Sequence, residues 1–329
     1  MRTLALAFTL AVLAAPVLAQ VPDWVAPMQA VYANFTGPHG RISRFGDSIT
    51  VSKAFWSPLQ WGYTNTAAQP GSQAALDWIQ NHDANTAWNI DPVIWTWQDS
   101  YQIHGAEGGM TAAWPLTSAS GWAGALPGER KVDYWLRVDR PEMAIVMYGS
   151  NDMPGTAVAT YKANMAAIAQ ACINAGTIPI LTTAPPKHGV AIATSNAFAQ
   201  AIRDIANNVG GVLTPSTVRL PVIDYYQDIL TRNPDPTWDG ANTTVWPGYS
   251  GYEVPTSISC DGVHPSNWTP GKSNFSNDGL RTNGFNDRNI LSLMKSYEVY
   301  QQVIVPEPAS LLLLALGGAV VTARRRNRR

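Results

Sequence analysis

Three short polar segments contain the residue types that serine-based acyl transfer requires. They are Gly-Asp-Ser at positions 46–48, Gly-Ser-Asn-Asp at 149–152 and Asp-Gly-Val-His at 261–264. A serine hydroxyl is a weak nucleophile until a base takes its proton. His264 could be the base for Ser48, and Asp261 could hold the imidazole in the required tautomer. The side-chain amide of Asn151 could donate to the oxyanion that forms on the substrate.

Predicted strands and helices alternate around these segments. A short strand is predicted over 41–45, a continuous apolar run predicts a strand over 143–148, and further strands are expected over 178–183 and 222–225. Apolar residues spaced by three and four predict a helix over 156–175, and further helices are expected over 195–209 and 288–303. This order predicts an α/β layered sheet with parallel strands, which bind ligands outside their carboxyl ends. The first two polar segments each follow a strand, and the third precedes the last helix. All three are therefore expected at one edge of the sheet.

Each candidate residue also has a structural interpretation. Ser48 alone could be a helix N-cap, Asn151 alone could be a turn former, and Asp261 with His264 could be a hydrogen-bonded loop pair. The three segments together, in this order along the predicted sheet, favour a catalytic interpretation.

The three segments resemble blocks I, III and V of the SGNH hydrolases, also called the GDSL esterase/lipase superfamily. The resemblance runs from about residue 41 to 303. It implies a flavodoxin-like three-layer α/β/α sandwich with a central parallel sheet, and ester hydrolysis without a cofactor. It further implies that Ser48 is the nucleophile, His264 the base and Asp261 its orienting partner. The oxyanion hole would then include the backbone N–H of Ser48 and the side chain of Asn151.

The resemblance also requires a block II glycine as an oxyanion donor. Gly109 is the nearest match, and Gly105 or Gly108 could serve instead. Because 61 residues separate Ser48 from Gly109, we expect an inserted segment at about 52–100. A second Trp-rich insertion is expected at about 231–259. Aromatic side chains in these loops could stack on sugar rings, although core packing is the usual role of any single Trp.

Both ends of the chain look like processing signals. Residues 1–19 combine Arg2, an apolar run and small residues before a cut after Ala19, which predicts a secretory signal peptide. At 305–329, a Val-Pro-Glu-Pro segment precedes fifteen uncharged residues and an arginine-rich end. This tail resembles the PEP-CTERM sorting signal of Gram-negative bacteria. The resemblance implies a short transmembrane segment, processing by an exosortase, and display at the cell surface or release.

Between the two signals, residues 20–304 are expected to form one domain. This body contains 16 basic and 22 acidic residues, a net charge of −6, which argues against nucleic-acid binding. Cys172 and Cys260 could form a single disulfide in an oxidising compartment. Alternatively, Cys172, at an apolar position of a predicted helix, is a small buried apolar side chain.

These observations predict an exported serine esterase that removes acyl groups, with acetyl as the expected group, from a carbohydrate or another small ester. One alternative is a surface or matrix carbohydrate-binding protein that uses the same scaffold without turnover. Another is an O-acyltransferase, because the sequence does not separate water from a sugar hydroxyl as the acceptor.

Overall fold

The computed structural model of the chain describes residues 21–52, 54–56, 58–59, 63–66, 69–81, 102–103, 105–232, 258–259, 262–266 and 273–305. The predicted signal peptide and nearly all of the predicted sorting tail lie outside these residues. Cys260 and Asp261 do too.

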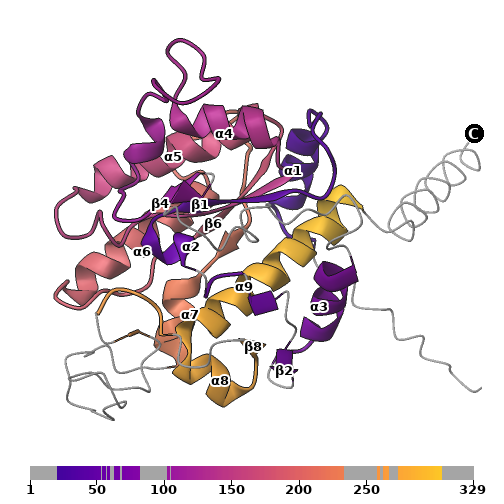
Figure 1. Cartoon of the computed structure of the whole chain (residues 1–329), viewed down its shortest axis with the longest axis vertical. Coiled ribbons are helices and arrows are strands. Elements are labelled where there is room, and N and C mark those ends of the chain that lie inside the picture. Colours follow the sequence, from indigo (N-terminus) through magenta and orange to yellow (C-terminus); the bar gives the residue numbers. More distant parts are fainter. Residues whose placement is uncertain are drawn as a thin grey trace, which may run out of the picture.

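A six-stranded sheet forms the centre of the described structure (Figure 1). Its order is β3 (Gln102–Ile103), β4 (Ala106–Glu107), β1 (Ile42–Gly46), β5 (Met143–Met147), β6 (Ile178–Thr182) and β7 (Val222–Ile223). Only β3 is antiparallel to its neighbour. The five parallel strands, numbered along the chain, have the order 2-1-3-4-5 across the sheet. This is the flavodoxin-like order, and it confirms the predicted fold class.

The three long strands are buried along their whole length. Every residue of β1, β5 and β6 is buried, as expected for central parallel strands that are covered on both faces. β1 and β5 pair in register from Ile42 opposite Met143 to Gly46 opposite Met147. Their carboxyl ends therefore lie side by side, and the polar segments that follow them begin at the same edge.

Helices cover both faces of this sheet. α4 (Lys131–Asp139), α5 (Val158–Asn174) and α6 (Ile192–Ala206) pack against one another in that order. Figure 1 shows α4 and α5 on one side of the sheet and α9 (Gly284–Val299) on the other. α9 packs against α3 (Ser72–Asn81), and α1 (Val25–Tyr32) packs against the π-helical turn η4 (Tyr300–Ile304). The result is a three-layer α/β/α sandwich.

Four shorter helical elements complete this part of the structure. They are α2 (Ser48–Val51), the 3-10 turn η3 (Trp114–Leu116), α7 (Tyr225–Arg232) and α8 (Asn277–Thr282). A separate parallel pair joins β2 (Tyr63–Asn65) to β8 (Ser273–Asn274). This pair ties the segment after α2 to the segment before the last helix.

Two predicted helices have different boundaries in the structure. α6 begins at Ile192 rather than at residue 195, and it ends at Ala206 because Asn208 adopts a positive φ of 50°. α9 begins at Gly284, four residues before the predicted start. Asn283 caps it by accepting a hydrogen bond from the Asn286 N–H at 3.0 Å.

The first inserted segment is only partly a loop, because it contains β2 and α3. Trp56 and Trp78 are 1% and 4% exposed, so the expectation that inserted Trp rings stack on sugar is wrong for these two. The backbone N–H of Trp56 donates to Asn289 Oδ1, on α9, at 2.6 Å. The other Trp residues of the two insertions lie outside the described residues: Trp61, Trp88, Trp95, Trp97, Trp238 and Trp246.

Cys172 is a free cysteine and is fully buried on α5, as expected for a small apolar core residue. Burial raises the pKa of its thiol far above the usual range.

None of the helices in the described part of the chain is long and apolar enough to cross a membrane.

Candidate functional site

Ser48 is the first residue of a one-turn helix that follows β1 directly. Asp47 is the N-cap of α2, and its carboxylate accepts a hydrogen bond from the Ile49 N–H at 3.0 Å. The turn is tight because Gly46 has no side chain. A Cβ at Gly46 would overlap the Thr50 hydroxyl and lie 2.5 Å from the Met147 carbonyl oxygen. This turn leaves Ser48 half-buried at the carboxyl edge of the sheet.

His264 reaches the same edge from the other end of the chain. Its Nε2 lies 2.8 Å from Ser48 Oγ, across 216 positions of sequence. Two backbone hydrogen bonds close the surrounding turn: the Gly262 N–H donates to Ser259 O at 2.9 Å, and the Ser259 N–H donates to His264 O at 2.7 Å. With Nε2 unprotonated, the imidazole can accept the Ser48 proton.

Asn151 and Asp152 connect two loops of the site. The Asn151 side chain donates to Met110 O at 3.1 Å, and the Asp152 carboxylate accepts from the Ala112 N–H at 3.0 Å. Burial raises the pKa of Asp152 to about 6, against the opposing effect of the Ala112 hydrogen bond. The loop with the block II candidates is thereby held against the loop that follows β5.

The three block II glycines differ in their surroundings. Gly105 has a φ of 82°, and a Cβ there would overlap the Phe45 ring. Its carbonyl oxygen accepts from the Gly46 N–H at 3.2 Å and the Tyr148 hydroxyl at 2.7 Å, so Gly105 serves close packing. Gly109 has a φ of 78° and is exposed, with open space where a Cβ would point. Gly108 is half-buried beside it.

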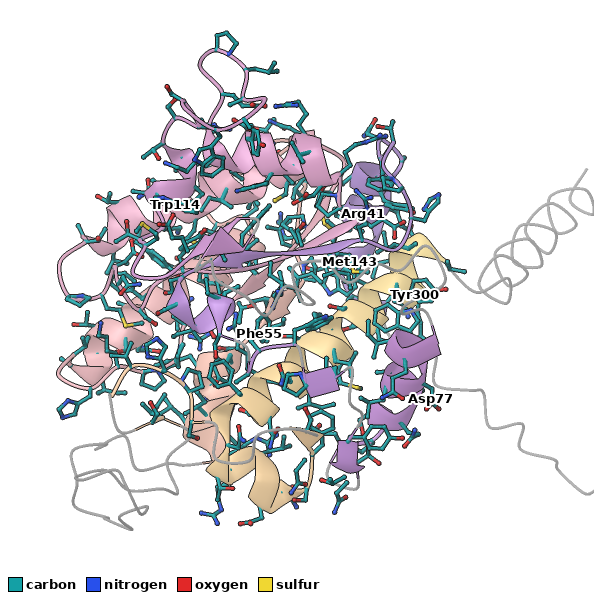
Figure 2. The ribbon with its side chains drawn as sticks, viewed as in Figure 1. Arg41, Phe55, Asp77, Trp114, Met143 and Tyr300 are labelled. Carbon is teal, nitrogen blue, oxygen red and sulfur yellow. The ribbon has the colours of Figure 1, made fainter. Side chains whose placement is uncertain are left out.

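The candidate site lies at the carboxyl ends of the parallel strands, and the amino ends of these strands lie on the opposite side of the molecule. In Figure 2, Arg41 and Met143 mark the amino ends of β1 and β5, and Trp114 lies at the other end of the sheet. Trp114 begins η3, which follows the 109–112 loop. The site residues therefore gather where parallel sheets place their ligands.

Sequence reasoning missed Arg288, which lies beneath this site. Its guanidinium is fully buried and donates to Ile49 O at 2.7 Å and to Thr50 Oγ1 at 2.9 Å. It also lies 3.6 Å from the centre of the Phe55 ring. Burial lowers the pKa of Arg288 to about 9, and attraction to Asp47 opposes that shift. A charged residue in a predicted helix gives no sequence signal for this role, because most such residues are solvated.

Asp47 is the second buried charge below Ser48. Burial raises the pKa of Asp47 to about 6, although the Ile49 N–H and the charge of Arg288 lower it. A carboxyl whose pKa is higher in the folded state holds a proton that the unfolded chain releases. Its contribution to folding is therefore most favourable below about pH 4 and is lost as the pH rises through about 6.

We predict that Asp47→Asn stabilises the protein at alkaline pH. The amide oxygen can still accept from the Ile49 N–H, and the ionisation is removed. The free energy of unfolding should exceed that of wild type by about 3 kcal/mol at pH 8 and by almost nothing at pH 4. Urea titrations at a series of pH values measure this difference. A difference that is constant from pH 4 to pH 8 would contradict the prediction.

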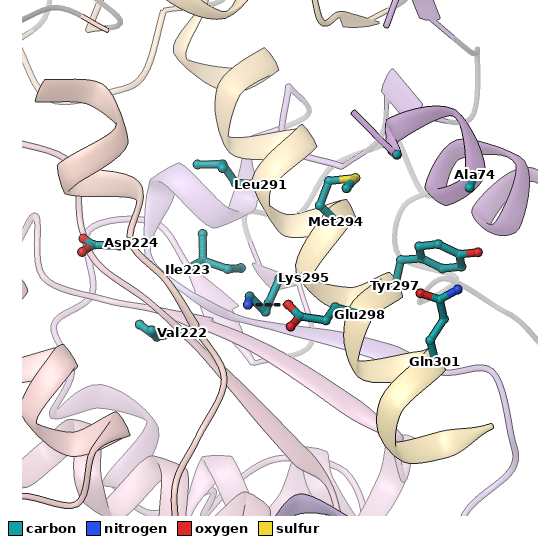
Figure 3. Close-up of a pocket in the computed structure, with 11 residues that line it drawn as sticks. Ala74, Val222, Ile223, Asp224, Leu291, Met294, Lys295, Tyr297, Glu298 and Gln301 are labelled. Atoms are coloured by element: carbon teal, nitrogen blue, oxygen red, sulfur yellow. Dashed lines mark hydrogen bonds and ion pairs between the residues drawn. The ribbon is translucent and has the colours of Figure 1, made fainter. Parts of the chain in front are cut away.

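One cavity among the described residues lies away from this site (Figure 3). It has a volume of about 510 Å³ and lies between α3, β7 and α9. Leu291, Met294 and Ile223 contribute apolar walls, and Lys295 pairs with Glu298 at its rim. None of Ser48, Asn151 and His264 lines it.

Comparison with known families identifies the tail. Residues 305–329 match the PEP-CTERM protein-sorting motif. The motif indicates export and cell-surface sorting in Gram-negative bacteria, and it implies processing by an exosortase-type enzyme. The sequence has no significant match among curated proteins.

Several solved structures are similar in fold. One is an acetyl esterase mutant with acetate ion, with a TM-score of 0.43 and 16% identity over 80% of this chain and 97% of the other. A second is the psychrotrophic esterase EstA from Pseudoalteromonas sp., inhibited by monoethylphosphonate, with a TM-score of 0.41 and 14% identity over 80% and 97%. A third, from Desulfitobacterium hafniense, is described as a lipolytic protein of the G-D-S-L family, with a TM-score of 0.40 and 14% identity over 78% and 99%.

Proposed function

We propose that the protein is an exported serine esterase of the SGNH type that hydrolyses carboxylic esters. The observation that carries the proposal is the 2.8 Å separation between Ser48 Oγ and His264 Nε2. A nucleophile and its base must lie within hydrogen-bonding reach, and this pair is brought together from distant parts of the sequence. We assign the nucleophile to Ser48, the base to His264 and the orienting carboxylate to Asp261.

The proposed reaction proceeds through an acyl-enzyme. His264 Nε2 takes the Ser48 proton as Oγ forms a bond to the substrate carbonyl carbon, and the imidazolium then returns the proton to the departing alcohol. In the second half, water gives a proton to His264 and attacks the acyl carbon; the bond from this carbon to Ser48 Oγ then breaks, the imidazolium returns the proton to Oγ, and the acid is released. The carbonyl oxygen becomes negative in both halves.

Three donors could stabilise that oxyanion. We assign them to the Ser48 backbone N–H, the Asn151 side chain and the Gly109 backbone N–H. Asn151 Nδ2 carries two N–H bonds and uses one of them on Met110 O, so the other can serve the oxyanion. Gly109 lies next to Met110, and this supports its assignment over Gly105, which packs against Phe45.

For the substrate, we propose O-acetyl groups on a carbohydrate. The sorting motif supports a location at the cell surface, where acetylated polysaccharide would be accessible. In this proposal residues 1–19 are a signal peptide and residues 20–304 form the catalytic domain. Transfer of the acyl group to a sugar hydroxyl would use the same first half-reaction.

Active-site labelling tests the proposal directly. A fluorophosphonate should phosphonylate Ser48 as Oγ bonds to phosphorus, fluoride leaves and the hydroxyl proton passes to His264. Mass spectrometry of the digested protein should find the label on the peptide that contains Ser48. Acetate release from acetylated glycans, with and without a sugar acceptor, then separates hydrolysis from transfer.

Labelling that persists on another serine in Ser48→Ala, with esterase activity intact, would overturn the assignment. Folded wild-type protein that takes no label and hydrolyses no ester, but binds glycans, would favour a binding protein instead.

A further inference from the structure

The loop between β6 and α6 bridges the two sides of the proposed catalytic site. Lys187 Nζ donates to Ser150 O at 2.8 Å, one residue before Asn151. The next residue, His188, donates its backbone N–H to Gly262 O at 2.8 Å, two residues before His264. This loop therefore contacts both segments, and its lysine ammonium lies at Ser150, beside the proposed oxyanion residue Asn151.

The charge of Lys187 is not neutralised within the described structure. Lys162 pairs with Asp204 at 2.9 Å and Lys295 pairs with Glu298 at 2.5 Å. Within the described ranges, Lys187 forms no ion pair, and its one hydrogen bond is to a backbone carbonyl. An ammonium has three N–H donors, so two remain. Lys187 is half-buried.

The buried carboxylates near the site use other partners. Asp47 is stabilised as an anion by the Ile49 N–H, Arg288 and His264, and Asp152 by the Ala112 N–H. Neither carboxylate lies within ion-pair distance of Lys187. Within the part of the chain that the structure describes, the ammonium therefore has no carboxylate partner, and a negatively charged group on a ligand would provide one.

We propose that Lys187 binds a carboxylate on the substrate, so that the enzyme prefers esters of acidic molecules, such as acetylated uronic-acid sugars. This inference rests on the proposed esterase function. The body has a net charge of −6 and repels anions at long range, so a local cation is needed for such a substrate to bind. Lys187 would act on specificity, while Ser48, His264 and Asn151 carry out the chemistry.

A matched pair of esters tests the proposal. The anion 4-acetoxybenzoate and its neutral methyl ester contain the same acetyl ester bond and differ in one charge. We define the charge preference as kcat/KM for the anionic ester divided by kcat/KM for the neutral ester. Lys187→Met should lower this preference about five- to tenfold at low ionic strength, and Lys187→Arg should retain most of it.

The ratio separates binding of the carboxylate from support of the Ser150 loop. Loss of the Ser150 hydrogen bond would slow both esters equally and leave the charge preference unchanged. Lys295→Met removes one positive charge away from the site and serves as the control, with an expected charge preference equal to that of wild type. Added NaCl should lower the wild-type preference towards that of Lys187→Met, because salt screens the attraction.

The outcomes distinguish failure of the Lys187 proposal from failure of the esterase proposal. If wild type hydrolyses both esters and Lys187→Met leaves the charge preference unchanged, the role of Lys187 is overturned and the esterase proposal stands. If folded wild type hydrolyses neither ester, or if Ser48→Ala hydrolyses them as fast as wild type, the esterase proposal itself fails.

Discussion

Ser48→Ala is expected to lower kcat for p-nitrophenyl acetate hydrolysis by about 10⁴- to 10⁶-fold, and His264→Ala by a similar factor. The alanine at 48 leaves no oxygen to form the acyl-enzyme, and the alanine at 264 leaves no base 2.8 Å from Oγ. Because the two residues act in one step, the double variant should be no slower than either single variant. Initial rates on purified, folded protein measure the three losses.

Ser52→Ala is the matched control for this prediction. Ser52 follows α2, and its hydroxyl accepts from the Ala54 N–H at 3.2 Å, so the change removes a serine hydroxyl four residues from the proposed nucleophile. It should retain most of the wild-type kcat. Losses that add in the double variant would show that Ser48 and His264 act separately, and a loss in Ser52→Ala as large as that in Ser48→Ala would point to damage of the turn.

The sequence predicts the centre of this fold because β5 is a continuous apolar run, whereas β1 is a shorter candidate that also buries Ser43 and Arg44. β1, β5 and β6 are buried on both faces and end in polar turns, and the sheet rule then places Ser48 and His264 at one edge. The structure places these two side chains in contact. Their catalytic roles stay predictions, and Asp261 lies outside the described residues.

Short elements gave no sequence signal of their own. β4 has only two residues, which is too few for an alternating pattern, and its place in the sheet depends on the close approach of Gly105 to Phe45. α4 was missed because its buried residues, Val132, Tyr134 and Leu136, alternate with charged and half-buried ones.

α9 was predicted to begin too late because its first turns bury polar side chains instead of apolar ones. Arg288 donates to Ile49 O and Thr50 Oγ1, and Asn289 donates to Ala54 O at 3.0 Å. These residues hold the segment that contains Ser48, so hydrophobic spacing does not mark this part of the helix. The start of a helix with buried polar side chains can be recognised only in the folded structure, where the residues that accept their hydrogen bonds, at 49–54, are in place.

Asn151→Ala is expected to lower kcat by about 10²- to 10³-fold with little change in KM. The second N–H of the amide would stabilise charge that appears on the carbonyl oxygen only in the transition state, so its loss affects turnover more than substrate binding. Steady-state kinetics with p-nitrophenyl acetate separate the two parameters. The Ser48 and His264 variants lose more, because they remove the bond-forming step itself.

Asn151→Ala also removes the hydrogen bond to Met110 O, so a matched change must isolate the effect on the oxyanion. Asn151→Asp has the same shape, but it replaces a donor with a negative oxygen. Repulsion between this carboxylate and the oxyanion should lower kcat below that of Asn151→Ala. Thermal unfolding of both variants reports any loosening of the loop. If Asn151→Asp turns over faster than Asn151→Ala, or if KM rises while kcat stays constant, Asn151 is not an oxyanion donor.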